Sequence, residues 1–285
     1  MRLVSYNSPS GPLWGLLGPS GVVASTQLGA DVPATVLELV SSPNWDTLVR
    51  ELPERAAKLS GVPMESLELL PVVPRPGKIL CLGVNYIDHA KEGGNQVGEY
   101  PSIFMRGATS LLAHGAALRV PGISTKLDFE AELAVVIGRT ARFVSEAHAL
   151  DTVFGYACFN DGTLRDYQRK TAQWTIGKNF DATGGFGPWL VTADELPPGC
   201  VGLHIESRLN GQVMQSANTK DMVFGVARTI ALLSESLTLE PGDVIIMGTP
   251  GGVGYARTPP VWMKAGDTIE IEIESIGVLS NPVTA

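Results

Sequence analysis

The sequence predicts a mixed α+β fold that is mainly β, a roll or sandwich of short strands decorated with short helices. The first observation is that 32 of the 285 residues are glycine and 20 are proline, more than the ~12% that average usage gives these two residues. The second is that turn clusters separate short extended runs along the whole chain. The third is that strands and helices do not alternate regularly enough for a doubly wound sheet.

The first 72 residues are expected to form a small α+β domain. Extended runs at 3–6, 13–17 and 22–25 are divided by Gly- and Pro-containing turn clusters, the pattern of a β-meander. One helix follows over 36–40, and Asn44 can cap a second that runs toward residue 60. Pro53 interrupts this second helix, so its continuity stays open. Three prolines between 71 and 76 then mark a boundary, which gives domains over 1–72 and 73–285.

The larger domain is expected to be built mainly from strands. Thr268–Glu274 is the clearest of them, because isoleucine and glutamate alternate along it. Few helices are expected, over 163–171 and 227–236. The other extended runs lie at 78–82, 103–104, 131–137, 152–159, 203–209 and 244–247.

Charge and composition exclude several classes of protein. The formal net charge is −8, from 21 Lys and Arg against 29 Asp and Glu, with no basic cluster, so a nucleic-acid partner is not expected. No apolar run approaches the ~18 residues of a membrane helix, and the first residues lack a signal-peptide core. Cys81, Cys158 and Cys200 are far apart and are expected to be small buried hydrophobes. We therefore expect a cytoplasmic protein without a membrane partner.

A run of alternating acids is the first candidate site. In a strand, Asp128, Glu130 and Glu132 share one face, and they are followed by the apolar run 133–137. They are either a solvated strand face or a site that needs a cation, because stacked buried carboxylates repel. Asp161 is a further candidate ligand, although Asp-Gly also suits a turn or a helix cap. Oxygen ligands alone favour Mg²⁺, Ca²⁺ or Mn²⁺ over zinc.

The second candidate is a short helix between glycines. Asn85 can cap it and Gly93-Gly94 can end it. His89 and Glu92 then lie three residues apart on one helix face, where the carboxylate would orient the imidazole as a general base. The glycines would let the segment act as a lid. The alternative is a surface pair without a function.

The third candidate is the glycine-rich segment 248–254, which follows an extended run. It lacks the lysine and the spacing of nucleotide-binding loops, but it could let a ligand approach backbone amides, with Thr249 offering a hydroxyl. A simple tight turn is equally consistent with it. Lys178 and Gln168 are polar residues in largely apolar or aromatic surroundings.

In this order the motifs resemble the fumarylacetoacetate hydrolase family, over about residues 78–283. The resemblance implies a β-sandwich roll, usually homodimeric, that holds Mg²⁺, Mn²⁺ or Ca²⁺ on Glu130, Glu132 and Asp161, with Asp128 outside this set. It rests on five ordered motifs: Gly83-Val84-Asn85-Tyr86-Ile87-Asp88-His89, Asp128-Phe129-Glu130-Ala131-Glu132-Leu133, Asn160-Asp161 through Arg165-Asp166-Tyr167-Gln168, Gly177-Lys178-Asn179-Phe180-Asp181, and Pro241-Gly242-Asp243-Val244-Ile245 leading into Gly248-Thr249-Pro250.

The resemblance also implies roles for other residues. His89 and Glu92 match a water-activating dyad on a lid helix, and Lys178 matches a lysine that stabilises developing negative charge. Gln168 and Thr249 match substrate contacts. Arg106 stands where many members carry the lysine of Phe-x-Lys-Pro, so the positive charge is kept with a changed geometry. Arg106 is also expected to contact the substrate.

The expected function is divalent-metal-dependent hydrolysis of a carbon–carbon bond in a 2,4-dioxo acid of the acylpyruvate or fumarylpyruvate type. The alternative is a tautomerase, isomerase or decarboxylase that acts on a related 2-oxo acid, of the oxaloacetate or hydroxyheptadienedioate type. A silent 2-oxo-acid binder would not need the His89–Glu92 pair. A non-haem iron oxygenase would need two histidines beside a carboxylate, which the chain lacks near Glu130.

Overall fold

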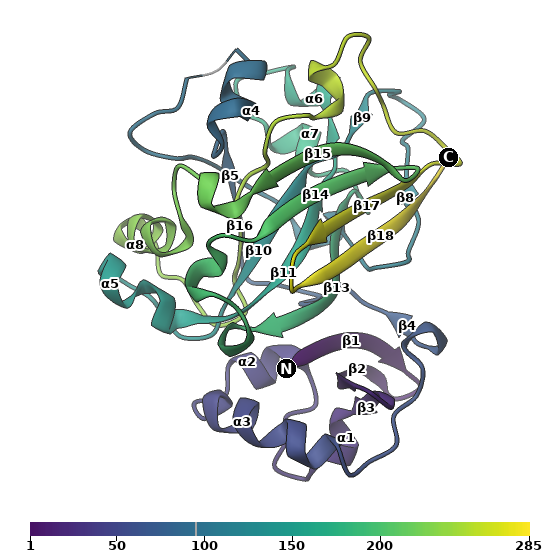
Figure 1. Cartoon of the computed structure of the whole chain (residues 1–285), viewed down its shortest axis with the longest axis vertical. Coiled ribbons are helices and arrows are strands. Elements are labelled where there is room, and N and C mark those ends of the chain that lie inside the picture. Colours follow the sequence, from purple (N-terminus) through teal and green to yellow (C-terminus); the bar gives the residue numbers. More distant parts are fainter. Residues whose placement is uncertain (95) are drawn as a thin grey trace.

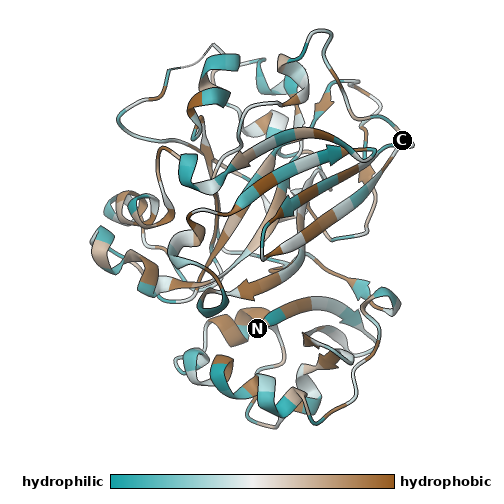
Figure 2. Cartoon of the chain, in the orientation of Figure 1, coloured by the Kyte–Doolittle hydropathy of each residue, from teal (hydrophilic) through white to brown (hydrophobic). Residues whose placement is uncertain are grey.

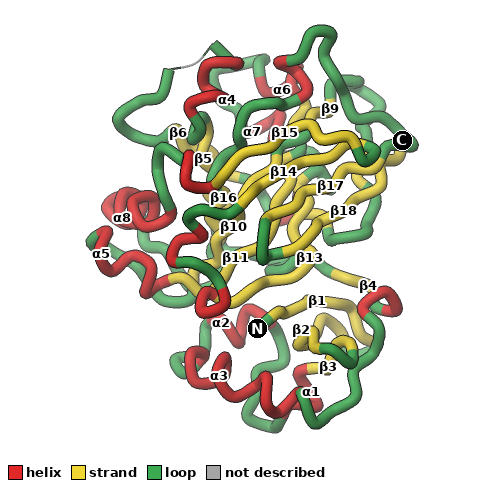
Figure 3. Tube along the Cα trace, in the orientation of Figure 1, coloured by secondary structure: helices red, strands yellow, loops and turns green. Residues whose placement is uncertain are grey.

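The computed structural model describes residues 1–94 and 96–285. Strands occupy the centre of the molecule and short helices lie around them (Figure 3). This arrangement confirms the predicted mixed α+β, mainly β fold. None of the helices in the described ranges is both long and apolar enough to cross a bilayer.

The larger sheet contains eleven strands of the described chain. Its order is β3-β2-β1-β13-β11-β10-β16-β5-β6, with β4 paired to β1 and β7 paired to β13. Their bounds are β1 (Arg2–Ser8), β2 (Gly11–Gly18), β3 (Gly21–Ala24), β4 (Glu68–Leu69), β5 (Ile79–Gly83), β6 (Ser102–Met105), β7 (Leu111–Leu112), β10 (Ala131–Ile137), β11 (Val153–Asp161), β13 (Gly184–Thr192) and β16 (Val244–Ile246).

A second sheet packs against the first and appears in front of β10 and β11 in Figure 1. Its five strands run in the order β15-β14-β17-β18-β8. They are β8 (Leu118–Arg119), β14 (His204–Leu209), β15 (Gln212–Asn218), β17 (Thr268–Ile273) and β18 (Gly277–Thr284), while the short strands β9 (Leu127–Asp128) and β12 (Thr163–Leu164) pair with each other.

The helices are short, apart from two. They are α1 (Ser25–Leu28), α2 (Val36–Val40), α3 (Trp45–Ala56), α4 (Ile87–Glu92), α5 (Glu146–Ala149), α6 (Arg165–Gln168), α7 (Thr175–Lys178) and α8 (Val226–Ser236). Short 3₁₀ helices cover Met64–Ser66, Ala108–Ser110, Leu150–Thr152, Ala193–Glu195, Pro198–Cys200, Thr219–Asp221 and Gly254–Ala256. Helices α4, α6 and α7 gather at the end of the molecule far from the amino-terminal unit (Figure 1).

Strand β10 is buried on both faces, as its unbroken apolar run predicts. Leu133 and Val135 join the core between the two sheets, whereas Ala134 and Val136 join a second core on the opposite face. Figure 2 shows apolar residues along these central strands. Because alternate residues of a strand share a face, Glu130 and Glu132 lie on the side of the second core.

The amino-terminal strands and helices pack against the second core. Residues of β1, β2, α2 and α3 share it with β10, β11 and β16, and Leu3 of β1 pairs with Leu190 of β13. The division into domains over 1–72 and 73–285 stays a prediction. Helix α3 continues through Pro53 to Ala56, although the missing N–H of a proline removes one backbone hydrogen bond of the helix.

Two element predictions differ from the structure. The helix expected over 163–171 is reduced to α6, which is preceded by the short strand β12. Ser25, expected at the end of a strand, begins the short helix α1. The three cysteines are buried and unpaired, as predicted.

Candidate active site

Three carboxylates from neighbouring strands gather at one end of the larger sheet. Glu132 lies in β10, Glu130 comes just before this strand, and Asp161 ends β11. The two strands are antiparallel, and the Asp161 N–H donates to the Glu130 carbonyl oxygen at 3.0 Å. One oxygen from each carboxylate lies within 4.8 Å of the others, and all three residues are buried. The structure thus brings the predicted metal ligands together, with Asp161 as a strand residue and not as a helix cap.

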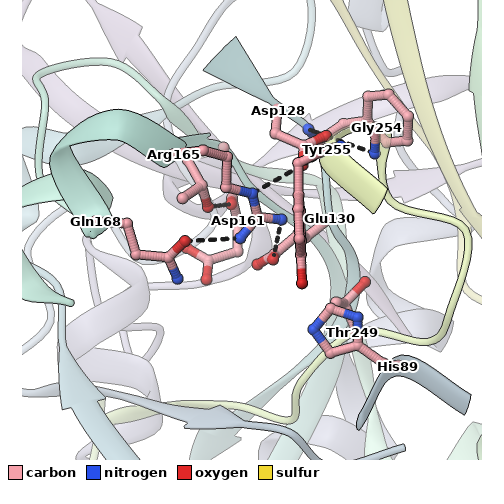
Figure 4. Close-up of polar contacts among 12 residues, drawn as sticks. His89, Asp128, Glu130, Asp161, Arg165, Gln168, Thr249, Gly254 and Tyr255 are labelled. Atoms are coloured by element: carbon pink, nitrogen blue, oxygen red, sulfur yellow. Dashed lines mark hydrogen bonds and ion pairs between the residues drawn. The ribbon is translucent and has the colours of Figure 1, made fainter. Parts of the chain in front are cut away.

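Two buried cations face this group of carboxylates. Lys178, the last residue of α7, donates to Glu130 and, at 2.6 Å, to Asp161 Oδ2. Arg165, the first residue of α6, donates to Glu130 Oε1 at 2.6 Å (Figure 4). Burial by itself would raise the pKa of Glu130, but Arg165 and Lys178 hold this pKa well below its usual range. Glu130 is therefore ionised and fully paired.

Asp128 shares Arg165 with Glu130 but faces away from the other carboxylates. It accepts from Arg165 Nε at 2.8 Å and from the backbone N–H groups of Gly254 and Tyr255 at 2.7 and 3.1 Å (Figure 4). Asp128 thus fixes a guanidinium and a turn of the backbone, which agrees with its place outside the predicted ligand set.

Arg106 lies behind Asp161 and does not line the cavity. Its guanidinium donates to the Asp161 carboxylate, to Ser110 Oγ at 3.1 Å and to Thr183 Oγ1 at 2.9 Å. Only 3% of this residue is exposed. The sequence predicted a substrate contact here. In the structure, however, the N–H groups of the Arg106 guanidinium donate to protein atoms, and the arginine positions Asp161.

Glu132 is the least compensated of the three carboxylates. It accepts from the Gly248 N–H at 2.5 Å, and it forms no ion pair with any residue that the structure describes. Burial raises its pKa well above the usual value, and the charges of Asp161 and Glu130 raise it further. An ionised Glu132 would therefore need a further positive charge beside it.

The charge balance of the whole group leads to the same conclusion. Four buried carboxylates, those of Asp128 and the three candidate ligands, face three buried cations, Arg106, Arg165 and Lys178. One negative charge is left over, and a buried charge without a partner is strongly unfavourable. A site made only of oxygen donors with excess negative charge suits a hard divalent cation such as Mg²⁺, Mn²⁺ or Ca²⁺. The residues present therefore fit the expected metal.

Helix α4 carries the predicted dyad. His89 Nδ1 lies 2.9 Å from Glu92 Oε1, and the Gly252 N–H donates to Glu92 Oε2 at 2.8 Å. His89 is buried and reaches the cavity. Glu92 thus connects the imidazole to the segment after β16, and the second ring nitrogen of His89 is free to contact a ligand or a water molecule.

Asn85 does not cap α4, contrary to the sequence prediction. The N-cap position is Tyr86, and the Asn85 side chain donates to the carbonyl oxygens of Phe224 and Met247 at 3.0 and 2.7 Å. Val84, directly before it, has a φ of 59°, a conformation that a β-branched residue rarely adopts. The entry to α4 is therefore anchored to β16, which holds the helix at the end of the sheet.

The glycine-rich segment 248–254 uses its backbone amides on the protein's own acids. Gly248 donates to Glu132, Gly252 to Glu92 and Gly254 to Asp128. Gly248 has a φ of 84°, and a Cβ there would lie 2.7 Å from the Asn85 side chain, so glycine is required. The sequence suggested that these backbone amides could bind a ligand. In the structure they position the carboxylates of the protein itself.

These groups surround a cavity of about 290 Å³. Thr249 lies at its wall and its hydroxyl accepts from Gln215 Nε2 at 2.7 Å. Gln168 lies at the opposite side and its Oε1 accepts from Arg165 Nη1 at 3.0 Å (Figure 4). Of the predicted site residues, the cavity is lined by His89, Glu130, Glu132, Gln168, Lys178 and Thr249.

Sequence reasoning missed several residues of this site. Arg165 belongs to one of the five motifs but has no predicted role, although an arginine that follows two acidic motifs is a candidate partner for their carboxylates. Gln215 holds Thr249 from β15, 34 residues away, and no local pattern points to it. The cavity is also lined by Trp174, by Arg169 and by Tyr255, which carry no local signal either.

Comparison with known proteins agrees with this geometry. Residues 78–284 match the family described as Fumarylacetoacetate (FAA) hydrolase C-terminal. The human mitochondrial oxaloacetate tautomerase FAHD2A is 38% identical over 289 residues, which cover 99% of this chain and 91% of that protein.

Two solved structures are similar over the whole chain. Maleylpyruvate hydrolase from Sphingobium sp. SYK-6 has a TM-score of 0.82 and 31% identity, covering 100% of this chain and 99% of that one. The 2-hydroxyhepta-2,4-diene-1,7-dioate isomerase from Mycobacterium marinum has a TM-score of 0.75 and 31% identity, covering 100% and 98%. With the buried acidic triad and this similarity together, the chain belongs to the fumarylacetoacetate hydrolase family, an enzyme superfamily with hydrolase, isomerase and tautomerase members.

Proposed function

We propose that this enzyme cleaves a carbon–carbon bond in a 2,4-dioxo acid of the acylpyruvate or fumarylpyruvate type, with a divalent metal and a water molecule activated by His89. The observation that carries the proposal is the hydrogen-bonded His89–Glu92 pair, whose imidazole lines the same cavity as Glu130 and Glu132. A general base beside a metal-binding group of carboxylates is the arrangement that hydrolysis of such a substrate needs.

Glu130, Glu132 and Asp161 would hold the metal. When bound, Mg²⁺ would orient the substrate through its 1-carboxylate and 2-oxo oxygens and stabilise negative charge on the enolate that leaves. Lys178 contacts two of the same carboxylates, so its ammonium group would lie near that developing charge and stabilise it further.

His89 would accept a proton from water, and the oxygen of that water would attack the 4-oxo carbon. The bond between C3 and C4 then breaks, its electron pair passes into the enolate of pyruvate, and the proton on His89 returns to C3. Glu92 Oε1, at 2.9 Å from Nδ1, would keep the second nitrogen of the ring directed at the water and stabilise the imidazolium. The hydroxyl of Thr249 and the amide of Gln168 would orient the substrate from opposite walls.

The second candidate is tautomerisation, isomerisation or decarboxylation of a related 2-oxo acid. It is favoured by the similarity to the oxaloacetate tautomerase, which is 38% against 31% for the maleylpyruvate hydrolase. A base in the position of His89 can move a proton between C3 and solvent without attack by water, so the same residues serve both reactions.

The test is an ultraviolet assay of enol absorbance with acetylpyruvate, fumarylpyruvate and oxaloacetate, with and without Mg²⁺. We expect Mg²⁺-dependent loss of absorbance with pyruvate as a product. Carbon dioxide release, or ketonisation of oxaloacetate without cleavage, would favour the second candidate. No reaction with any of the three substrates would favour the hypothesis that the protein binds a 2-oxo acid without catalysing a reaction.

Variants of the dyad identify the base. His89→Ala and Glu92→Gln should abolish turnover while Mg²⁺ binding persists. His148→Ala is the matched control, because His148 and Asp151 have the same i, i+3 spacing but are exposed on the surface. Equal activity of His89→Ala and His148→Ala would overturn the assignment. A homodimeric state and a cytoplasmic location stay predictions that rest on the family resemblance and on composition.

A further inference from the structure

One arginine at the cavity is not used by the proposed reaction. Arg169 follows α6 directly and lines the cavity beside Arg165 and Tyr255. It is exposed, whereas Arg165 is buried. Its guanidinium therefore faces the space that a substrate would enter.

The position of Arg169 is defined by an aromatic ring. Its guanidinium carbon lies 4.6 Å from the centre of the Tyr255 ring, and that of Arg165 lies 4.4 Å from the same centre. The backbone N–H of Tyr255 donates a hydrogen bond to the buried carboxylate of Asp128. The backbone that carries the ring is therefore fixed. Stacking on a fixed ring restrains a long side chain before any ligand arrives.

The charges around Arg169 leave it available for a ligand. Arg165 and Lys178 are paired with the buried carboxylates. Within the described ranges, Arg169 forms no ion pair and its side chain donates no hydrogen bond. A guanidinium that lines a cavity without an acidic partner is suited to bind a carboxylate in bidentate fashion.

The remaining walls of the cavity differ in character. Phe104 and Trp174 pack edge to face, with ring centres 5.9 Å apart, and form an apolar part of the lining. A negatively charged end of a substrate would avoid this part and be stabilised beside Arg169. A charged end of a substrate would therefore lie beside Arg169, whereas an apolar end would lie against the aromatic rings.

We propose that Arg169, held against Tyr255, binds a second carboxylate at the far end of the substrate and makes the enzyme selective for dicarboxylic 2-oxo acids. This inference rests on the proposed function in one respect, that the 2-oxo acid end is held by the divalent cation that Glu130, Glu132 and Asp161 would bind.

The test is calorimetric binding in the presence of Mg²⁺, which does not need turnover. Each dicarboxylic 2-oxo acid is compared with its monocarboxylic partner of equal length: 2-oxoglutarate with 2-oxopentanoate, and 2-oxoadipate with 2-oxohexanoate. We expect the unmodified enzyme to bind at least one dicarboxylate about tenfold more tightly than its partner, as for one charge-assisted hydrogen-bonded pair. Arg169→Met should remove this difference without weakening binding of the monocarboxylates.

Lys170→Met is the matched control. It removes one positive charge from the next residue, whose ammonium group lies over the Tyr167 ring and not at the cavity, and it should keep the preference. The inference is overturned if the unmodified enzyme binds the members of each pair equally or not at all, or if Arg169→Met keeps the preference. Absence of turnover with every substrate, together with an intact Arg169-dependent preference, would instead contradict only the proposed reaction.

Discussion

Acids surround an arginine both on the surface of this protein and in its interior, and one cluster of each kind is compared. On the second sheet, Arg208 contacts Glu206, Glu270 and Glu272 at 2.6–3.0 Å. At the site, Arg165 contacts Asp128 and Glu130 at 2.6–2.8 Å. The distances are alike, so distance does not distinguish the structural cluster from the candidate site.

Burial distinguishes them. The acids around Arg208 keep 16–42% of their side chains exposed, whereas Asp128 and Glu130 keep at most 4%. Water stabilises an exposed charge whether or not it is paired, so the surface cluster contributes little. In the interior each charge needs a partner, and the one negative charge left over at the site could be balanced by a bound cation. Four predictions test this comparison.

The largest difference should appear when one acid of the buried site and one acid of the surface cluster are neutralised. Glu132→Gln removes a proposed metal ligand and should reduce Mg²⁺ affinity and activity by more than ~100-fold, since loss of even an outer partner of a metal ligand costs 10–100-fold. Glu272→Gln should leave both unchanged. Calorimetry with Mg²⁺ and the enol assay measure the two effects, and similar losses in both variants would contradict the comparison.

Removal of one buried cation at the site should lower stability more than removal of the exposed Arg208. Lys178→Met leaves two buried carboxylates with one partner fewer and should reduce the free energy of unfolding by ~3 kcal/mol in the absence of metal. Arg208→Met should cost less than ~1 kcal/mol. Urea unfolding in the presence of a chelator measures both. Equal costs would show that burial does not set the difference.

Arg106 tests how far the buried network extends. Because it holds Asp161 and does not line the cavity, Arg106→Met should weaken Mg²⁺ binding by about tenfold. KM for the substrate at saturating Mg²⁺ should change little. A raised KM with unchanged metal affinity would instead support the substrate contact that the sequence suggested.

The smallest effect concerns pH. Burial and two neighbouring carboxylates raise the pKa of Glu132 well above its usual value, so as the pH falls this carboxyl takes up a proton while ordinary glutamates are still ionised, and a cation must displace that proton. Mg²⁺ affinity should therefore fall with falling pH, at most by about tenfold per unit. Calorimetric titrations at a series of pH values measure the slope, and an affinity independent of pH would contradict the assigned role of Glu132.

Local patterns predicted much of the fold. The alternation in 268–273 and the apolar run in 131–137 both appear as strands. Strand β13 was missed because its Gly-Gly-Phe-Gly-Pro start has weak strand propensity. Tertiary packing explains why glycine is needed in this strand, since a Cβ on Gly185 would lie 2.7 Å from the Asn281 side chain of β18. Such close approach between distant strands leaves no local signal.

The sequence by itself determined which carboxylates could share a face and which acid could orient His89, because the spacings of strands and helices are local properties. Only the tertiary structure decided that Asp161 joins Glu130 beside β10 and β11, that Arg106 turns inward, and that Arg169 lines the cavity with no acidic partner in the described part of the chain. The physical reason is that burial and charge balance depend on residues far apart in the chain, and these come together only when the sheets pack.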